Sequence, residues 1–172
     1  ISAIGSLLEN TSKYIDYFLR PHVAGLQSYI KDTRDFLSVI KDIHWERDFL
    51  LVTLDVTSLY TCIDHTLGIQ NCRHFLKTRS LSYYSHTEML LSMLKFCLTH
   101  NYFMFDDTIY CQTQGTAMGS CFAPSYANLF MGWWEEQVAS NILGFEHVVL
   151  WLRYIDYLFL ILKGDAREAK EF

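Results

Sequence analysis

Two apolar runs, 148–152 and 158–162, flank a short polar centre at 153–157 that reads Arg-Tyr-Ile-Asp-Tyr. Each run has the length and the β-branched and aromatic content of a buried strand. If the two strands pair as a hairpin, the turn presents Asp156 at its tip. A carboxylate at a hairpin tip keeps its charge without the cost of burial, so it can bind a cation. An isolated Asp there is more often a solvated turn residue, so a second carboxylate is needed to favour the metal site.

The second carboxylate is Asp55, which ends the apolar run 49–54. That run is typical of a fully buried strand, which we expect at the centre of a sheet. A carboxylate at the end of such a strand, facing one at a hairpin tip, can hold two divalent ions about 4 Å apart. This is the arrangement used for in-line phosphoryl transfer. The sequence therefore predicts a metal site formed by Asp55 and Asp156.

Helical spacing of apolar residues predicts most of the remaining elements. The predicted helices cover 6–20, which Pro21 should stop, 28–43, 66–77, 85–100, 124–141 and a partial helix at 165–172. A hairpin is predicted over 101–111, with its turn at Asp106-Asp107. We interpret this acidic pair as a turn and not as a metal site, because Asp favours turns and the flanking aromatic residues fit strand faces.

Composition sets the broad class of protein. The 172 residues are 51% hydrophobic and 16% aromatic, which indicates one well-packed domain and excludes a disordered segment. No apolar run reaches the roughly 20 residues of a membrane span, and no signal peptide is visible. The five cysteines lack zinc-ligand spacing, so we expect reduced and mostly buried thiols and no zinc site.

The formal net charge of −5 bears on possible partners. An enzyme that binds nucleic acid needs a basic surface for the phosphates. The acidic balance leaves two alternatives open. Either the basic parts lie outside this sequence, or the chain does not bind nucleic acid.

A glycine-rich loop, 112–123, precedes the helix predicted at 124–141. Gly115 and Gly119 let the backbone approach a flat or charged ligand, and a helix N-terminus supplies unpaired N–H groups. A glycine pair before a helix is by itself a weak signal. The order along the chain is the stronger one: an Asp after a strand, then a Gln-Gly loop and helix, then an Asp in a hairpin.

This order resembles the polymerase motifs of reverse transcriptases. The segment Asp55-Val56-x-x-Leu59-Tyr60 resembles motif A, the segment Arg153–Asp156 resembles motif C, and the Gln114-Gly115, Gly119 and Ala123-Pro124 positions resemble motif B. The block Gln-Gly-x-x-Met-Gly-x-x-x-Ala-Pro-x-x-Ala-Asn-Leu-Phe-Met from Gln114 is closer still to the reverse transcriptases of Penelope-like retroelements. The Leu-Tyr-Thr run from Leu59 points the same way, and the resemblance covers essentially the whole chain.

The resemblance implies an α+β fold: a right-hand polymerase palm whose small antiparallel sheet is backed by helices, with residues 1–48 as a partial helical fingers region and 49–172 as the palm. It implies RNA-directed DNA synthesis with Mg²⁺, or Mn²⁺ in its place, on an RNA template, a DNA primer and deoxynucleoside triphosphates. Asp55, Asp156 and the Val56 carbonyl would bind the metal. Tyr60 would pack under the sugar, and Gln114 and Gly115 would contact the nucleotide and template.

Tyr157 departs from the family pattern, because motif C of the family ends in two aspartates. A phenol is neutral at physiological pH and bulkier than a carboxylate. We therefore expect weak or absent polymerisation, and whether the chain is an active enzyme stays open. The alternative is a non-catalytic relic of a retroelement that binds RNA or protein as a scaffold. Cys62 and Asp64 also depart from the family's Leu-Tyr-Thr-Asn-Ile-Pro run.

The resemblance also implies parts beyond this sequence. A basic fingers motif would precede Ile1, and a thumb and an endonuclease domain would follow Phe172. A nuclear location is expected from the resemblance alone, and no membrane association is expected. The sequence leaves the template, the priming mode and the oligomeric state open.

Overall fold

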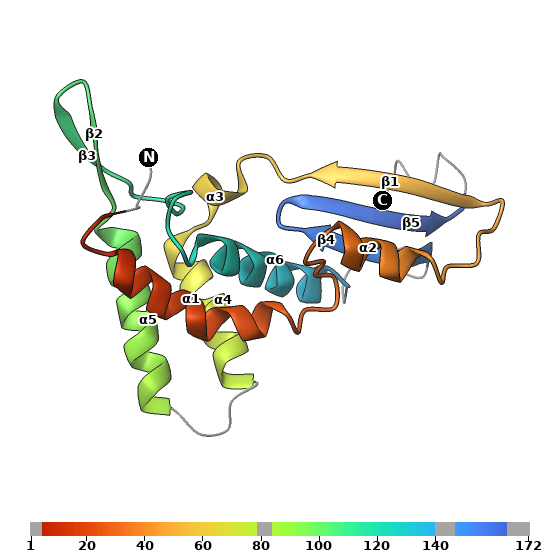
Figure 1. Cartoon of the computed structure of the whole chain (residues 1–172), viewed down its shortest axis with the longest axis horizontal. Helices are drawn as coiled ribbons and strands as arrows, with labels where there is room; N and C mark the ends of the chain where they lie inside the picture. Colours follow the sequence, from red (N-terminus) through yellow and green to blue (C-terminus); the bar gives the residue numbers. More distant parts are fainter. Residues whose placement is uncertain (1–4, 79–83, 140–146, 165–172) are drawn as a thin grey trace. The chain divides into compact units, whose positions relative to one another are not determined.

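The computed structural model of this chain describes residues 5–78, 84–139 and 147–164 (Figure 1). These residues form helices and antiparallel strands joined by loops, which confirms the predicted α+β class. They form two compact units, each assembled from separate stretches of the sequence. Within the described ranges, no helix is both long enough and apolar enough to cross a membrane.

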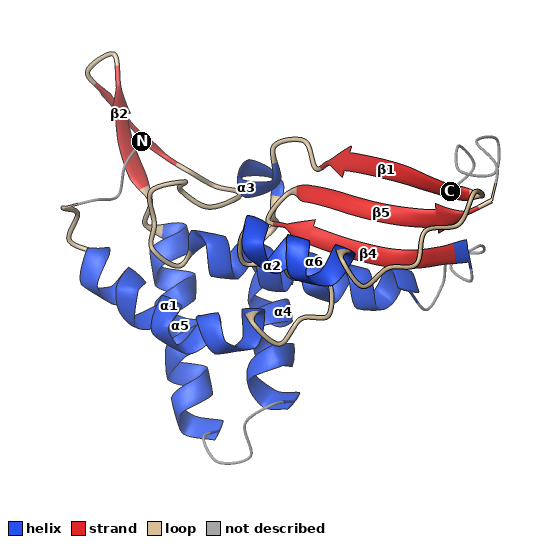
Figure 2. Cartoon of the chain, turned by 45° about the vertical axis from the view of Figure 1, so that its right-hand side comes forward, coloured by secondary structure: helices blue, strands red, loops and turns tan. Residues whose placement is uncertain are grey.

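The second of the two units combines Leu26–Thr57 with Trp134–Phe172 and contains a three-stranded antiparallel sheet. Its strands are β1 Phe49–Asp55, β4 Val148–Tyr154 and β5 Tyr157–Lys163, in the order β1-β5-β4 (Figure 2). The predicted hairpin is thus present. Its polar centre is shorter than expected, because only Ile155 and Asp156 lie between the strands.

β1 is an edge strand of this sheet, not the buried central strand that its apolar sequence predicted. Leu51 and Leu54 are 59% and 47% exposed. The central position belongs to β5, whose alternate residues Leu158, Leu160 and Leu162 form a buried cluster. A run rich in Leu and Val favours a strand, but it does not specify how many neighbours that strand has.

Helix α2 spans Thr33–Ile40 and is shorter than the predicted helix at 28–43. The Arg153 N–H donates to the Ser28 carbonyl at 2.6 Å, and the Ile30 N–H donates to the Arg153 carbonyl at 3.0 Å. Residues 28–30 therefore run in an extended conformation beside β4 instead of forming a helix. The helix begins after Asp32, whose carboxylate accepts the Asp35 N–H at 2.9 Å as an N-cap.

The first unit combines Ile1–Gly25 with Ser58–Trp133 and is mainly helical. Its elements are α1 Glu9–Val23, α3 Leu59–Cys62, α4 His65–Thr78, α5 Tyr84–Thr99, β2 Tyr102–Phe105, β3 Thr108–Cys111 and the first part of α6 Ala123–Ala139. Helices α1, α4 and α5 pack against one another. The helices predicted at 66–77 and 85–100 are confirmed. The end of the helix predicted at 124–141 and the one at 165–172 lie outside the described residues.

Three local features of the first unit differ from expectation or refine it. Helix α1 passes through Pro21 to Val23, because Pro21 lies in the last turn and the buried Leu19 and Val23 keep that turn packed. The short helix α3 was not predicted. Asp106 and Asp107 form the β2–β3 turn with positive φ angles of 48° and 54°, so their interpretation as a turn is confirmed.

The cysteines are all free, but only Cys72 and Cys97 are buried, whereas Cys62 and Cys111 are exposed. The expectation of mostly buried thiols was therefore wrong. Burial raises the pKa of the Cys97 thiol from its ordinary value of 9.0 to about 11 and also raises that of Cys72.

We predict that a thiol reagent at pH 8 modifies Cys62 and Cys111 quickly, while Cys72 and Cys97 react only after unfolding. The buried thiols also make stability depend on pH. The pKa of a thiol is near 9 in the unfolded chain, whereas that of Cys97 in the folded chain is about 11. The stabilisation of the folded state by the protonated Cys97 thiol is therefore complete below pH 9 and is lost as the pH rises to about 11. Mass spectrometry of labelled peptides and urea unfolding across this pH range test both points. Equal labelling rates for the four thiols would contradict the prediction.

Gly68 of α4 packs directly on Tyr126 of α6. A Cβ at Gly68 would lie 1.9 Å from the Tyr126 hydroxyl oxygen. That buried hydroxyl has no hydrogen-bond partner among the described residues. The contact therefore requires glycine at 68 but does not require the hydroxyl at 126.

We predict that Gly68→Ala lowers the free energy of unfolding by about 3 kcal/mol through overpacking. Tyr126→Phe should be neutral or stabilising, because it removes a buried hydroxyl without breaking a bond. Combining the two changes should recover some of the lost stability, because the hydroxyl oxygen nearest to the added Cβ is gone. The recovery should be incomplete, because two ring carbons still lie 2.4 and 2.8 Å from that Cβ. Urea unfolding of the variants measures this coupling, and strictly additive effects would refute it.

Candidate functional site

Backbone pairing in the second unit brings the predicted metal ligands together. Asp55, the last residue of β1, is the register partner of Tyr157, the first residue of β5. One residue further on, the Val56 N–H donates to the Asp156 carbonyl oxygen at 3.0 Å. Asp55, Val56 and Asp156 therefore lie at one end of the sheet on two adjacent chain segments. The metal-site hypothesis requires this proximity.

The turn that carries Asp156 has an unusual backbone. Tyr154 and Tyr157 are register partners, so the turn contains only Ile155 and Asp156. Ile155 has a φ of 57°, a left-handed conformation that is rare for a β-branched residue. Such a residue costs on the order of 1–3 kcal/mol and persists only when its surroundings hold it in place.

The donor set of this site suits a hard cation. Asp55 is exposed and Asp156 is half-buried, and each ionised carboxylate offers only oxygen acceptors. Mg²⁺ prefers such oxygen ligands and keeps several of its own waters, so two carboxylates and a main-chain carbonyl are compatible with it. Among the described residues, however, no group of three or more His, Cys, Asp or Glu side chains could hold a metal ion.

Tyr157 explains part of this shortage of acidic ligands. It is 60% exposed and lies opposite Asp55 in the register. Cβ atoms of such directly paired residues are about 5 Å apart. The position opposite Asp55 thus carries a neutral phenol, whereas a carboxylate there would add a third acidic oxygen donor to the same end of the sheet.

The remaining predicted site residues lie together in the first unit. The Gly115 N–H donates to the Ile63 carbonyl at 2.9 Å, and the Thr116 N–H donates to the Tyr60 carbonyl at 2.7 Å. Gly115 has a φ of +73°, and a Cβ there would lie 2.4 Å from the Tyr60 carbonyl oxygen. The loop therefore needs glycine both for its conformation and for its close contact with α3.

Two side-chain contacts connect the glycine loop to the end of α3 and the start of α4. The Gln114 side-chain amide donates to the Cys62 carbonyl at 2.8 Å. His65 at the start of α4 places its Nε2 2.7 Å from the Gly115 carbonyl oxygen. Tyr60, Gln114 and Gly115, to which the resemblance assigns nucleotide contacts, therefore lie close together in the backbone. The role of His65 was missed, and no sequence pattern pointed to it.

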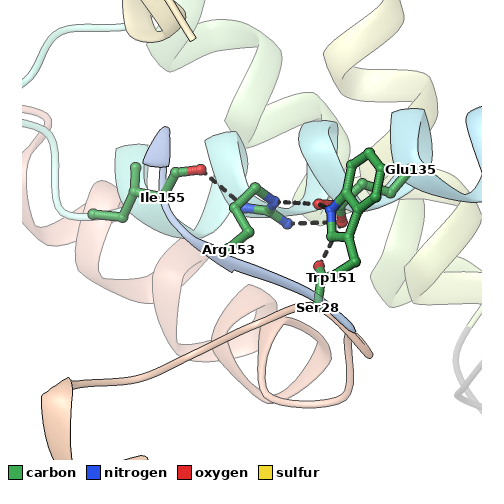
Figure 3. A network of polar contacts seen from close by, with 5 residues as sticks. All are labelled: Ser28, Glu135, Trp151, Arg153 and Ile155. Atoms are coloured by element: carbon green, nitrogen blue, oxygen red, sulfur yellow. Dashed lines mark hydrogen bonds and ion pairs between the residues drawn. The ribbon is translucent and has the colours of Figure 1, made fainter. Parts of the chain in front are cut away.

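A buried polar network in the second unit was also missed (Figure 3). Arg153 is completely buried, and its Nε donates to Glu135 of α6 at 2.7 Å. Ser28 and Trp151 donate to the same carboxylate at 2.5 and 3.1 Å. Arg153 Nη2 also donates to Glu135, at 3.2 Å, and Nη1 donates to the Ile155 carbonyl at 3.1 Å. A lone Arg within an apolar strand was the available signal, because a buried guanidinium needs an acidic partner.

Comparisons with known proteins place the fold. No family model matches the sequence, and no curated protein sequence matches it. Among solved structures, telomerase from Candida albicans in complex with a TWJ fragment of telomeric RNA is similar, with a TM-score of 0.68 and 8% identity over 94% of this chain and 32% of that chain. Apo telomerase from Candida tropicalis truncated from its C-terminal domain gives a TM-score of 0.61 and 13% identity over 94% of this chain and 36% of that chain.

The chain thus spans about a third of the length of these telomerase structures. At such low identities, the likeness shows the fold. That fold is an α+β fold of antiparallel sheets and helices, like the matching region of these telomerase structures.

The glycine loop yields a prediction with a matched control. Gly115→Ala should lower the free energy of unfolding by about 3 kcal/mol or more, because the new Cβ meets backbone atoms of α3 that cannot rotate away. Gly5→Ala should cost only about 1 kcal/mol, since Gly5 has a similar φ of +76° but nothing lies within 4 Å of its added Cβ. Chemical denaturation of both variants gives the comparison. Similar losses in the two would show that the close approach of the loop to Tyr60 is not tight.

Proposed function

We propose that this chain is the palm, with part of the fingers, of an RNA-directed DNA polymerase of the kind found in Penelope-like retroelements. In this proposal residues 1–48 belong to the fingers and 49–172 to the palm. The observation that carries it is the pairing of Asp55 and Val56 with the Asp156 turn at one end of the sheet. The similarity to telomerase, which is itself a reverse transcriptase, supports it at the level of the fold.

In the proposed reaction, Asp55, Asp156 and the Val56 carbonyl would hold Mg²⁺, for which Mn²⁺ could substitute. The metal would supply charge stabilisation to the oxygens that exchange in nucleotidyl transfer. Tyr60 packs under the sugar of the incoming deoxynucleoside triphosphate. Gln114 and Gly115 contact the base pair formed with the template, and the glycine leaves room for a close approach.

Tyr157 limits this activity in our proposal. With the phenol opposite Asp55, the site has two carboxylates to balance the charge of the metal ions, so metal affinity and primer positioning are weakened. The same observation favours a second candidate function. A chain that keeps the fold but lacks an acidic group at position 157 can act as a non-catalytic scaffold that binds RNA or protein.

The proposed partners are an RNA template and a DNA primer, and the proposed location is the nucleus. One of the similar telomerases is in complex with a fragment of telomeric RNA, which makes RNA the first partner to test. The net charge of −5 opposes binding of a phosphate backbone by this chain alone. We therefore expect the RNA affinity of this chain alone to be weak.

The test restores the acidic group. Tyr157→Asp should raise the affinity for Mn²⁺ by about tenfold or more, because a charge is added beside Asp55. Titration calorimetry or the electron paramagnetic resonance of free Mn²⁺ measures this. In primer extension on an RNA template, Tyr157→Asp should extend a primer faster than the natural chain.

Two variants serve as controls for this test. Tyr157→Phe removes only the hydroxyl, so its Mn²⁺ affinity should equal that of the natural chain. Asp55→Asn should abolish binding in the Tyr157→Asp background. Mn²⁺ binding that is indifferent to Asp55 would refute the proposed site, and extension by neither form would favour the scaffold function.

A further inference from the structure

The turn that presents Asp156 is not held by its own sequence. Two-residue hairpin turns with a positive φ at the first position favour glycine there, and this chain has Ile155. A side chain branched at Cβ resists this conformation. Some other group must therefore keep the turn in place, and the position of the Asp156 carboxylate depends on that group.

Arg153 contacts this turn directly. Its Nη1 donates to the Ile155 carbonyl at 3.1 Å, while Nε and Nη2 donate to the two Glu135 oxygens at 2.7 and 3.2 Å. The planar guanidinium has donors in a fixed fork, so fixing one side of it against Glu135 also fixes the direction of the other. Glu135 is held in turn by Ser28 and Trp151 (Figure 3).

Stability alone is a poor explanation for this network. Arg153 is completely buried and the Glu135 side chain is only 13% exposed, so both charges have lost most of their hydration. Buried ion pairs of this kind often contribute no more stability than apolar side chains of the same size. What apolar side chains cannot supply is a donor aimed at the Ile155 carbonyl.

We propose that Arg153 is a positioning residue, oriented by Glu135, that holds the strained Ile155-Asp156 turn and thereby sets the place of Asp156 beside Asp55. The link to metal binding rests on the proposed function. The effect of Arg153 on the turn does not depend on the proposed function, because that effect concerns the backbone conformation alone. The Val56 N–H reports the turn directly, since it donates to the Asp156 carbonyl.

The decisive comparison is between Arg153→Lys and Ser28→Ala. A Lys ammonium lacks the fork and cannot bond Glu135 and the Ile155 carbonyl together in the same way. Ser28→Ala removes one bond to Glu135 but leaves the Arg153–Ile155 bond intact. Hydrogen exchange by NMR measures the protection of the Val56 amide, normalised to that of the Leu160 amide in the centre of β5. We expect Arg153→Lys to lower this normalised protection about tenfold more than Ser28→Ala does.

Ile155→Gly provides the rescue. Glycine adopts a positive φ without strain, so the turn no longer needs Arg153. The double change Arg153→Lys with Ile155→Gly should recover most of the Val56 protection. Equal losses for Arg153→Lys and Ser28→Ala, or no recovery with Ile155→Gly, would overturn the proposal. If Arg153→Lys does not fold, Arg153→Met with Glu135→Gln replaces it, since this uncharged pair has no donor at position 153 for the Ile155 carbonyl.

Mn²⁺ titration of the same variants separates this proposal from the proposed function. If the site binds metal, Arg153→Lys should lower the Mn²⁺ affinity about tenfold and Ile155→Gly should restore it. An unchanged affinity in Arg153→Lys would overturn the positioning role. If the natural chain and Tyr157→Asp both fail to bind Mn²⁺, the proposed function fails, and the Val56 amide still decides whether Arg153 holds the turn.

Discussion

The second unit depends on satisfying one buried charge. The Arg153 guanidinium is fully buried, and an unpaired cation there would cost several kcal/mol. Its partner Glu135 comes from α6. The main chain of Arg153 forms hydrogen bonds with Ser28 and Ile30, which come from a distant part of the sequence. A single residue of β4 therefore ties together a helix, an extended segment and a turn. The contacts with Glu135, Ser28 and Ile30 are not local in sequence, so the arrangement is specified only when the whole unit has folded.

The periodicity of apolar residues was enough to predict the strands of this unit, but not their places in the sheet. The runs at 148–152 and 158–162 pair as a hairpin because their Leu and Val residues favour strands. The sequence offered no means to see that Arg153 and Tyr157 also lie in the strands, since polar residues between two apolar runs usually mark a turn. Likewise, the extended form of 28–32 depends on backbone bonds to Arg153 that no local pattern encodes.

The candidate site was predictable to the extent that it follows from chain order. A residue at the end of β1 and one in the β4–β5 turn come to the same end of the sheet when β1 pairs with β5 antiparallel, and the backbones of Asp55 and Asp156 do so. The glycine at 115 was predictable as a point of close approach, although the surface it approaches, the Tyr60 backbone, was not. Glu135 and His65 could not be named from the sequence, because no local pattern specifies their contacts with Arg153 and Gly115. The lone Arg153 in an apolar strand indicated only that some acidic partner was needed.

The packing of the sheet does not depend on the side chain at position 157. Position 157 is 60% exposed, and its contribution to the sheet is a main-chain pairing that any residue other than proline can make. The residues that hold the sheet together are its neighbours Leu158, Leu160 and Leu162, which are buried. Replacing a carboxylate by a phenol at position 157 therefore leaves the packing unchanged while it removes a charge from the end of the sheet. The fold requires apolar residues in alternation, whereas the proposed reaction would require acidic groups at the edge of the sheet, so the two requirements fall on different residues.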